Sequence, residues 1–341
     1  MHPFDRYAAF TDLKLLKEFS QRPLRKSKRV NTLKTSVESF KKWGKEKGWV
    51  MEQIPWCPEG FFIDRENREE ALGKDLLHLM GHSYMQEAAS MLPVMLLNPQ
   101  PGNFILDMSA APGSKTTQAA ALMKSKGVII ANDVQEKRLW TLKSSLFRLG
   151  VTNAVVTKKV GQWFSKHMTE RFDCVLCDAP CTAQGTSRKD SDALMYCSAD
   201  NIGKMAKLQR ELLEAAIHAA KVGGVVVYST CTLTPEENEE VVQSLLNKFS
   251  DQLEVIPPAE NLGLQKGIED SQIVQKSLGI TKLFPSVRLW PQTYDTEGFF
   301  AVAFRKKART KDKFPVDIIR TQEDLLPRSR QKEMGNVLEK T

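Results

Sequence analysis

The sequence predicts an α/β protein with a Rossmann-like, doubly wound and mostly parallel sheet. Two observations lead to this prediction. From Ile105 onward, short apolar runs alternate with helical patterns, as successive strand–helix units do. The apolar runs, for example residues 225–230, also lack polar alternation, which is typical of strands covered on both faces.

Ahead of this region, the pattern predicts a small α+β module that ends near residue 75. Its expected elements are strands at 28–33, 49–54 and 60–63 and a helix at 36–47. In the α/β region the expected strands are 105–108, 128–133, 154–157, 174–178 and 225–230. The expected helices there are 114–123, 135–149 and 199–221, the last ended by Gly223 and Gly224.

The C-terminal third contains a helix signal, a loop signal and a hairpin signal. Thr234-Pro-Glu-Glu237 predicts a capping box that opens a helix to about Phe249. The glycine-rich residues 261–279 predict a loop, and 286–289 with 298–304 predict a terminal antiparallel hairpin. The predicted domains are therefore an N-terminal basic module at 1–75, a catalytic domain at 76–306 and a charged C-terminal tail at 307–341.

Composition limits the class of protein. With 41% hydrophobic and 26% charged residues, the chain has the make-up of a soluble globular protein. It contains no charge-free apolar run of the ~18 residues that a membrane span needs, and MHPFDRYAAF lacks the apolar core of a signal peptide. We expect a cytoplasmic monomer with no membrane partner, in which the six cysteines form no structural disulfides.

The positive charge is concentrated at the N-terminus. Residues 1–50 hold 13 Lys and Arg against 5 Asp and Glu, a net charge of +8 that equals the excess of the whole chain. The densest piece, QRPLRKSKR, ends at Arg29. Such a segment favours a polyanionic partner, because neutralised phosphates release counterions. Charge alone fits a solvated basic surface equally well.

A candidate cofactor turn follows the first strand of the α/β region. The stretch Asp107-Met-Ser-Ala-Ala-Pro-Gly-Ser-Lys115 joins a strand to a helix start through small residues, which lets backbone amides approach a ligand. It lacks G-x-G-x-x-G, so a pyrophosphate ligand fits poorly. Asp133 ends the next strand, where an acid can bind both hydroxyls of a ribose. S-adenosyl-L-methionine is therefore the predicted cofactor, although Asp133 alone could equally be a helix cap.

Three cysteines lie within the eight residues 174–181, and they do not predict a metal site. Cys174 and Cys177 are an odd number of residues apart in a strand, so they point to opposite faces of the sheet. The five histidines offer no pair at ligand spacing. We interpret these two cysteines, and also Cys57 and Cys197, as structural and predict no metal.

Cys181 and Cys231 differ from the other cysteines because each follows the carboxyl end of a predicted strand. That edge is where open α/β sheets bind ligands. Asp178-Ala-Pro-Cys181 places an acid beside one thiol, and the helix start predicted at Thr234 is expected to favour a Cys231 thiolate. Either cysteine alone is more often a buried core residue, but together with the cofactor turn they indicate a site.

Several motifs, in their order along the chain, resemble the Sun/Fmu (RsmB/RsmF-like) family of RNA cytosine-5 methyltransferases. They extend from about residue 25 to residue 306, and the pairing of DAPC with STC is the most specific. The motifs are RVNTLK, YMQEAASMLP, DMSAAPGSKTT, CDAPC, YSTCTLTPEENE and EGFFAVAFRK. The resemblance implies a Rossmann-like class I methyltransferase fold, with a seven-stranded sheet and a terminal antiparallel hairpin.

The resemblance also implies roles for individual residues. Cys231 would add to carbon 6 of cytosine, Cys181 would help to break the adduct after methylation, and Asp178 would contact the base near ring nitrogen 3 and the cofactor. Arg29 and Asn31 would touch RNA. The residues expected to hold S-adenosyl-L-methionine, besides Asp133 and Asp178, are Ser109, Ala110, Ala111, Pro112, Gly113, Ser114 and Lys115.

This sequence departs from the family pattern at two places. The family usually has Cys-Ala-Ala-Pro-Gly-Gly-Lys, whereas Ser109 and Ser114 stand here, both still small. No acid occurs in 158–162, where many members contact adenine, so adenine contacts stay unassigned.

Two rival functions remain at this point. A methyltransferase for an exocyclic amine or protein amide would need an aromatic clamp that Asp178-Ala-Pro-Cys181 lacks. A catalytically silent RNA-binding or ribosome-assembly factor would not need the two thiols and the acid. Ribosomal and transfer RNA both remain open as the RNA partner.

Overall fold

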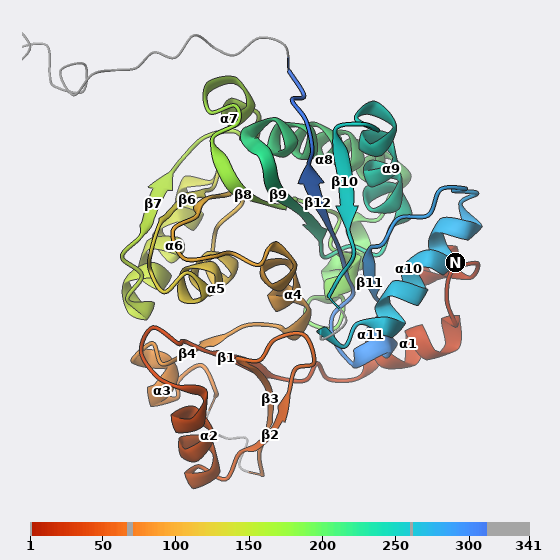
Figure 1. Cartoon of the computed structure of the whole chain (residues 1–341). Coiled ribbons are helices and arrows are strands. Elements are labelled where there is room, and N and C mark those ends of the chain that lie inside the picture. Colours follow the sequence, from red (N-terminus) through yellow and green to blue (C-terminus); the bar gives the residue numbers. More distant parts are fainter. Residues whose placement is uncertain (1, 67–70, 260–261, 312–341) are drawn as a thin grey trace, which may run out of the picture. The chain divides into compact units, whose positions relative to one another are not determined.

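The computed structural model describes residues 2–66, 71–259 and 262–311 (Figure 1). The chain divides into two compact units, Met1–Thr310 and Lys311–Thr341. Nearly all of the second unit, and with it most of the predicted tail at 307–341, lies outside the described residues. In the part of the chain that is described, no helix combines the length and the apolar character needed to cross a membrane.

The N-terminal part contains a small antiparallel sheet with the strand order β2-β3-β1-β4. Its strands are β1 (Ser27–Val30), β2 (Val50–Gln53), β3 (Gly60–Asp64) and β4 (Ser83–Met85). Its helices are η1 (Pro3–Tyr7), α1 (Leu13–Gln21), α2 (Val37–Glu46) and α3 (Leu76–Leu79). Ser36 caps α2 by accepting a hydrogen bond from Ser39 N, and Phe40 of α2 packs on Trp49 and Phe61 in a core of its own. The strands and the helix predicted here are confirmed.

The larger sheet has eight strands in the described residues. Seven follow the order β10-β12-β9-β8-β5-β6-β7, and β11 pairs with β12. The pairs β5–β6, β6–β7, β5–β8 and β8–β9 are parallel, whereas β12 runs antiparallel to its neighbours. The strands are β5 (Phe104–Asp107), β6 (Val128–Asn132), β7 (Ala154–Thr157), β8 (Phe172–Asp178), β9 (Ala220–Thr230), β10 (Leu253–Ile256), β11 (Val287–Leu289) and β12 (Phe299–Lys306). The mostly parallel sheet with a terminal hairpin is confirmed, with eight strands in place of seven.

Helices cover both faces of this sheet (Figure 1). On one face, α4 (Ala88–Leu97) and α5 (Ser114–Leu122) form a core with Ile105 and Cys174. On the other face, α7 (Gly161–His167), α8 (Ala199–Ala219) and α9 (Glu239–Lys248) pack on Leu106 and Cys177. Successive residues of β5 and β8 thus alternate between two cores. The remaining helices are α6 (Glu136–Leu149), η2 (Gln184–Thr186), η3 (Ser191–Tyr196), η4 (Pro235–Glu237), α10 (Gln265–Ser277) and α11 (Pro291–Tyr294).

The structure corrects three predicted elements. The predicted loop at 261–279 contains helix α10. Helix α8 ends at Ala219, and β9 begins at Ala220 and runs through both glycines with a register shift against β8. The helix predicted from Thr234 begins only at Glu239, after the short 3-10 turn η4. No capping box forms, because the hydroxyl of Thr234 donates to the carboxylate of Glu237 instead of accepting from its backbone.

Candidate active site

Three loops leave the parallel strands at the same edge of the large sheet. β5 ends at Asp107, β8 at Asp178 and β9 at Thr230, and the three strands are neighbours. The strand order changes direction at β5, which pairs with both β6 and β8, so the loops after β5 and β8 diverge there. Such a switch point is where doubly wound sheets bind ligands.

Backbone hydrogen bonds tie the loops near this edge to one another. Gly185 N donates to Cys231 O at 3.0 Å, and Gly298 N donates to Gly185 O at 2.9 Å. Backbone groups alone therefore connect the loop after β8, the loop after β9 and the segment just before β12.

The structure brings Cys181 and Cys231 together. Their Sγ atoms lie 3.4 Å apart, because β8 and β9 are paired in parallel with Asp178 opposite Ser229. The hydrogen bond with Cys231, and then burial, raise the pKa of Cys181 well above its usual value. Cys181 therefore stays a thiol at neutral pH.

The other cysteines lie elsewhere. Cys174 and Cys177 belong to the cores on opposite faces of the sheet, as their spacing predicts, and burial raises the pKa of Cys174 to about 12. Cys57 is buried in a third core, and Cys197 donates to Leu194 O. All six cysteines are free, and the described residues hold no group of side chains suited to a metal ion.

Two hydrogen bonds hold the carboxylate of Asp178, one at each oxygen. Its Oδ2 accepts from Lys115 Nζ at 2.7 Å, and its Oδ1 accepts from Ser229 Oγ at 2.7 Å. Burial opposes the charge of Lys115, but the attraction and the hydrogen bond of Asp178 raise the pKa of the lysine. The lysine therefore stays charged.

A cavity of about 350 Å³ opens beside this ion pair. Its wall combines the turn after β5 with the start of α5, the end of β8 and residues near β12. Of the predicted site residues, it includes Ser109, Ala110, Ala111, Pro112, Ser114, Lys115, Asp178 and Cys231. The turn is closed by Ala110 N donating to Asn132 O and Gly113 N donating to Ala110 O, both at 2.7 Å. Gly113 and Cys181 are not among the lining residues of this cavity.

Asp133 does not line the cavity as the structure stands. It is 2% exposed, and Arg138 Nη1 lies 3.2 Å from its Oδ2 without hydrogen-bond geometry. The same Arg138 lines the cavity and donates to Ala111 O. Its guanidinium therefore stands between Asp133 and the predicted cofactor turn.

Two further acids belong to this region, and the motif-based prediction missed their roles. Burial raises the pKa of Asp107 to about 7, although Thr116 Oγ1 donates to its Oδ2 at 2.7 Å. Glu297 lines the cavity and is 7% exposed; burial, and then the charge of Glu87, raise its pKa to about 8. Glu297 Oε1 has no hydrogen-bond partner among the described residues. Glu297 lies in the EGFF motif, so the sequence did contain a signal that could have drawn attention to this residue.

The structure places Arg29 and Asn31, both predicted to contact RNA, in the interior, where each is 1% exposed. Arg29 reaches from β1 to α5, where it donates to Ser114 O at 2.7 Å and to Thr117 Oγ1 at 2.8 Å. Asn31 Nδ2 donates to the carbonyls of Gly81 and Leu149. Both side chains join the small sheet to the α/β region and offer no surface to RNA.

Comparison with known proteins gives two matching families. The family described as 16S rRNA methyltransferase RsmB/F matches residues 94–305, and the N-terminal domain of 16S rRNA methyltransferase RsmF matches residues 9–88. The ribosomal RNA small subunit methyltransferase F of Vibrio parahaemolyticus is 44% identical over 289 residues, which cover 84% of this chain and 58% of that protein. The protein of the same name from Aeromonas salmonicida is 43% identical over 296 residues, with the same coverage. The chain thus spans about 58% of the length of these curated relatives.

Solved structures show the same fold. A methyltransferase homolog protein from Pyrococcus horikoshii superimposes with a TM-score of 0.73 at 35% identity, over 89% of this chain and 93% of that one. NSun6 from the same organism has a TM-score of 0.71 at 24% identity, over 86% of this chain and 94% of that one. The family match over most of the α/β region agrees with the paired thiols, the ion pair and the cavity at the edge of the sheet. This chain therefore belongs to the RsmB/F family of 16S rRNA methyltransferases.

Proposed function

We propose that the chain methylates carbon 5 of a cytosine in 16S ribosomal RNA, with S-adenosyl-L-methionine as the methyl donor. The observation that carries this proposal is the 3.4 Å separation of Cys181 Sγ and Cys231 Sγ beside the Lys115–Asp178 ion pair. A methyltransferase that acts on an amine needs no thiol, whereas carbon 5 of cytosine is a poor nucleophile until a thiolate adds to carbon 6.

The two thiols take different roles in this proposal. The Cys231 thiolate would form a bond to carbon 6, which makes carbon 5 enamine-like and able to take the methyl group from the donor sulfur. A base would then accept the proton on carbon 5, and the released electron pair would expel the Cys231 thiolate from carbon 6. The raised pKa of Cys181 favours its thiol form, so Cys181 is suited to donating a proton to the departing Cys231 thiolate rather than to making the first attack. Asp178, oriented by Lys115 and Ser229, faces the base near ring nitrogen 3.

The residues of the cavity fit the cofactor. S-adenosyl-L-methionine supplies an electrophilic methyl group when bound. The small residues 109–113 leave backbone groups accessible in a cavity of about 350 Å³, and α5 begins directly behind them. Asp133 keeps a buried carboxylate oxygen without a hydrogen-bond partner, as a ribose ligand requires, and it becomes reachable once Arg138 moves aside.

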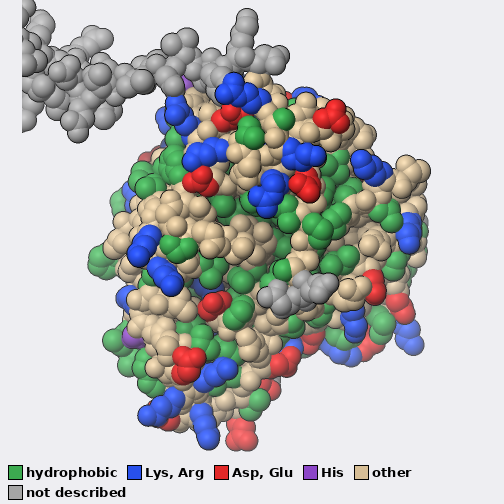
Figure 2. Space-filling view, viewed as in Figure 1, with side chains coloured by type: hydrophobic (Ala, Val, Ile, Leu, Met, Phe, Trp, Pro, Cys, Tyr) green, Lys and Arg blue, Asp and Glu red, His purple; other side chains and the backbone are tan. Residues whose placement is uncertain are grey.

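The RNA partner is proposed to contact exposed basic residues of the N-terminal module at 1–75 together with the catalytic domain at 76–306. Lys26, Lys34, Lys41, Lys42 and Lys45 are exposed there. In Figure 2, basic side chains are scattered among acidic ones over the visible face instead of forming one patch. Because a cytosine stacked in a helix is out of reach of the thiols, the target base lies in a loop or is flipped out.

Methylation of isolated RNA tests the proposal. The purified full chain is incubated with S-adenosyl-L-methionine and with naked 16S rRNA, assembled 30S subunits or transfer RNA, and the products are read by bisulfite sequencing. One protected cytosine in 16S rRNA is expected. Methylation of an exocyclic amine, or methylation of transfer RNA alone, would contradict the proposal. Binding without any transfer would favour the catalytically silent factor.

A further inference from the structure

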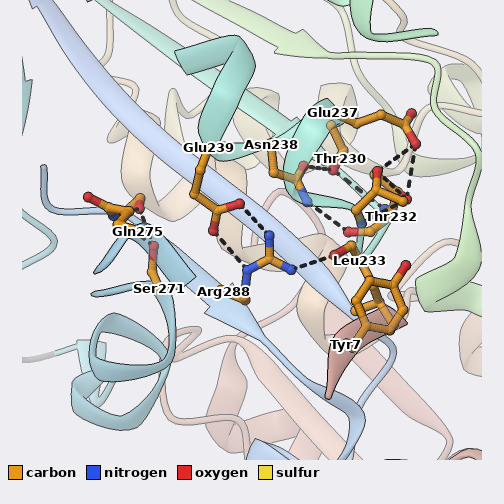
Figure 3. A network of polar contacts seen from close by, with 12 residues as sticks. Tyr7, Thr230, Thr232, Leu233, Glu237, Asn238, Glu239, Ser271, Gln275 and Arg288 are labelled. Carbon is orange, nitrogen blue, oxygen red and sulfur yellow. Dashed lines mark hydrogen bonds and ion pairs between the residues drawn. The ribbon is translucent and has the colours of Figure 1, made fainter. Parts of the chain in front are cut away.

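A fully buried carboxylate lies directly behind the two cysteine loops. Glu237 is 0% exposed, and its side chain points toward Thr232 (Figure 3). Both oxygens of its carboxylate accept hydrogen bonds. Its Oε2 accepts from Thr182 N at 3.0 Å and from Gln209 Nε2 at 2.8 Å. Its Oε1 accepts from Thr234 Oγ1 at 2.7 Å and also from Thr182 Oγ1. A carboxylate without water needs such donors, so the surrounding chain must keep them in place.

The donors come from the residues next to the two reactive thiols. Thr182 directly follows Cys181, and both its backbone and its hydroxyl donate to Glu237. Thr232 directly follows Cys231, and its hydroxyl lies 3.3 Å from Glu237 Oε1 and 3.1 Å from Thr182 Oγ1. One carboxylate therefore connects the loop after β8 with the loop after β9.

A second layer of side chains surrounds this carboxylate. Gln209 of α8, which donates to Glu237, also donates to Pro180 O at 2.8 Å, immediately before Cys181. Gln184 accepts from Thr232 Oγ1 at 3.0 Å and from Tyr7 OH at 2.8 Å. The cluster thus includes the N-terminal segment, and the groups that bond to Glu237 leave it little room to shift.

We propose that Glu237 is a positioning residue that holds Cys181 and Cys231 at the close approach needed for the covalent cycle. This inference rests on the proposed function and deepens it, because both thiols must reach one pyrimidine ring. Glu237 also has an electrostatic effect. After the hydrogen bond with Cys231, burial and the charge of Cys231, its carboxylate contributes to raising the pKa of Cys181. The same side chain thus holds the loop that carries Cys181 and also contributes to raising the pKa of this thiol.

The chain offers a matched control two residues away. Glu239 is also 0% exposed, but its carboxylate pairs with Arg288, which is 0% exposed as well (Figure 3). Arg288 in turn donates to Leu233 O at 2.8 Å, and no hydrogen bond joins Glu239 to Thr182 or Thr232 among the described residues. If the loss of any buried carboxylate disturbed the fold, a substitution at Glu239 would show the same defect as one at Glu237. A change in the position of the two thiols should instead appear only when Glu237 is substituted.

Thiol cross-linking measures the position of the cysteines without RNA or cofactor. Diamide takes two hydrogens from a thiol pair, becomes a hydrazine and leaves a disulfide, which intact mass and peptide mapping detect. The pair in the native protein should cross-link readily, because its sulfurs are 3.4 Å apart. In Glu237→Leu we expect Cys181–Cys231 cross-linking to slow by about 10- to 100-fold, since misplacement by about 1 Å has effects of that order. Glu239→Gln should cross-link like the native protein.

Catalysis supplies the second measurement. In Glu237→Leu we expect kcat to fall by about 100-fold, while KM for RNA and Kd for S-adenosyl-L-methionine stay close to native values. Glu237→Gln keeps the shape and one acceptor oxygen, so it should recover part of both kcat and cross-linking. Thr182→Val, which removes a hydroxyl but keeps the backbone donor, gives the same test if Glu237→Leu does not fold.

The results separate this inference from the proposed function. If the folded Glu237 and Thr182 variants cross-link and turn over like Glu239→Gln, Glu237 does not position the thiols and the inference is overturned. If cross-linking depends on Glu237 but the native chain methylates no cytosine, the proposed function fails while the positioning of the thiols stands.

Discussion

Arg29→Ala distinguishes a structural role of Arg29 from a contact with RNA. The guanidinium is buried between β1 and α5, where it donates to Ser114 O, to Thr117 Oγ1 and to Gln86 Oε1. After the substitution these three acceptors stay inside the protein without a charged donor. The fold should therefore lose stability, and the start of α5, which carries Lys115, should lose its anchor.

The size of the loss follows from these contacts. A hydrogen bond from a charged group contributes about 1.5–3 kcal/mol, so three bonds stabilise the fold by about 4.5–9 kcal/mol before the cost of burying the charge. That cost is evident, because burial lowers the pKa of Arg29 to about 10. We expect a net loss of about 3–5 kcal/mol, the range found when a buried charged contact is broken. At roughly 2–4 °C per kcal/mol, Tm should fall by about 10 °C.

The assay compares Tm with affinity for RNA. Tm is measured by calorimetry, and RNA binding by filter retention at a temperature at which the variant is folded. Lys26→Ala is the control, because Lys26 is an exposed neighbour and should change RNA affinity without changing Tm. An Arg29→Ala protein with native Tm and strongly weakened RNA binding would refute the structural role.

Three further predictions concern the two thiols, Cys231 and Cys181, and the buried acid Glu297. Cys231→Ser should abolish methyl transfer while calorimetry finds the affinity for S-adenosyl-L-methionine nearly unchanged; loss of cofactor binding would show that the thiol also shapes the cofactor pocket. Cys181→Ala should accumulate a covalent RNA adduct, visible as a slow band in a denaturing gel and absent from the Cys181→Ala/Cys231→Ser double variant. The pKa of Glu297 is raised from 4.5 to about 8 by burial and the charge of Glu87, so the folded state holds this proton more tightly than the unfolded state does. The contribution of Glu297 to stability is thus fully present below about pH 4.5 and declines up to about pH 8. As the pH rises through this window, the urea midpoint should fall less steeply in Glu297→Gln than in the native protein. Equal slopes for the two proteins would contradict the role of Glu297.

The fold was predictable wherever local pattern and long-range packing agree. The apolar runs at 174–178 and 225–230 became parts of β8 and β9 because strands covered on both faces need such runs. The prediction of a loop at 261–279 was wrong because the local glycine pattern and the long-range packing disagree there. Gly267 lies inside α10 because a Cβ there would come within 3.0 Å of Val287 Cγ1, so this glycine allows close packing rather than a turn. Such a reason is invisible until both elements are placed.

The candidate site shows the same division. The adjacency of Cys181 and Cys231 followed from one rule, that parallel strands end at the same edge of a sheet. The role of Glu237 did not follow, because its pattern also fits a helix cap, and the donors Thr182 and Gln209 are far away in sequence. The burial of Arg29 did not follow either, because neither the family resemblance nor the local positive charge reveals that this side chain lies in a buried junction.

The contact at Gly185 restricts how the loops around it can diversify in sequence. A Cβ at that position would lie 2.2 Å from Gly298 O and 2.6 Å from Cys231 O, so even alanine would push these backbones apart. The backbone around Cys231 therefore accepts almost no change at Gly185. A design that aims to change the proposed target nucleotide should leave this junction unchanged and mutate more distant surfaces.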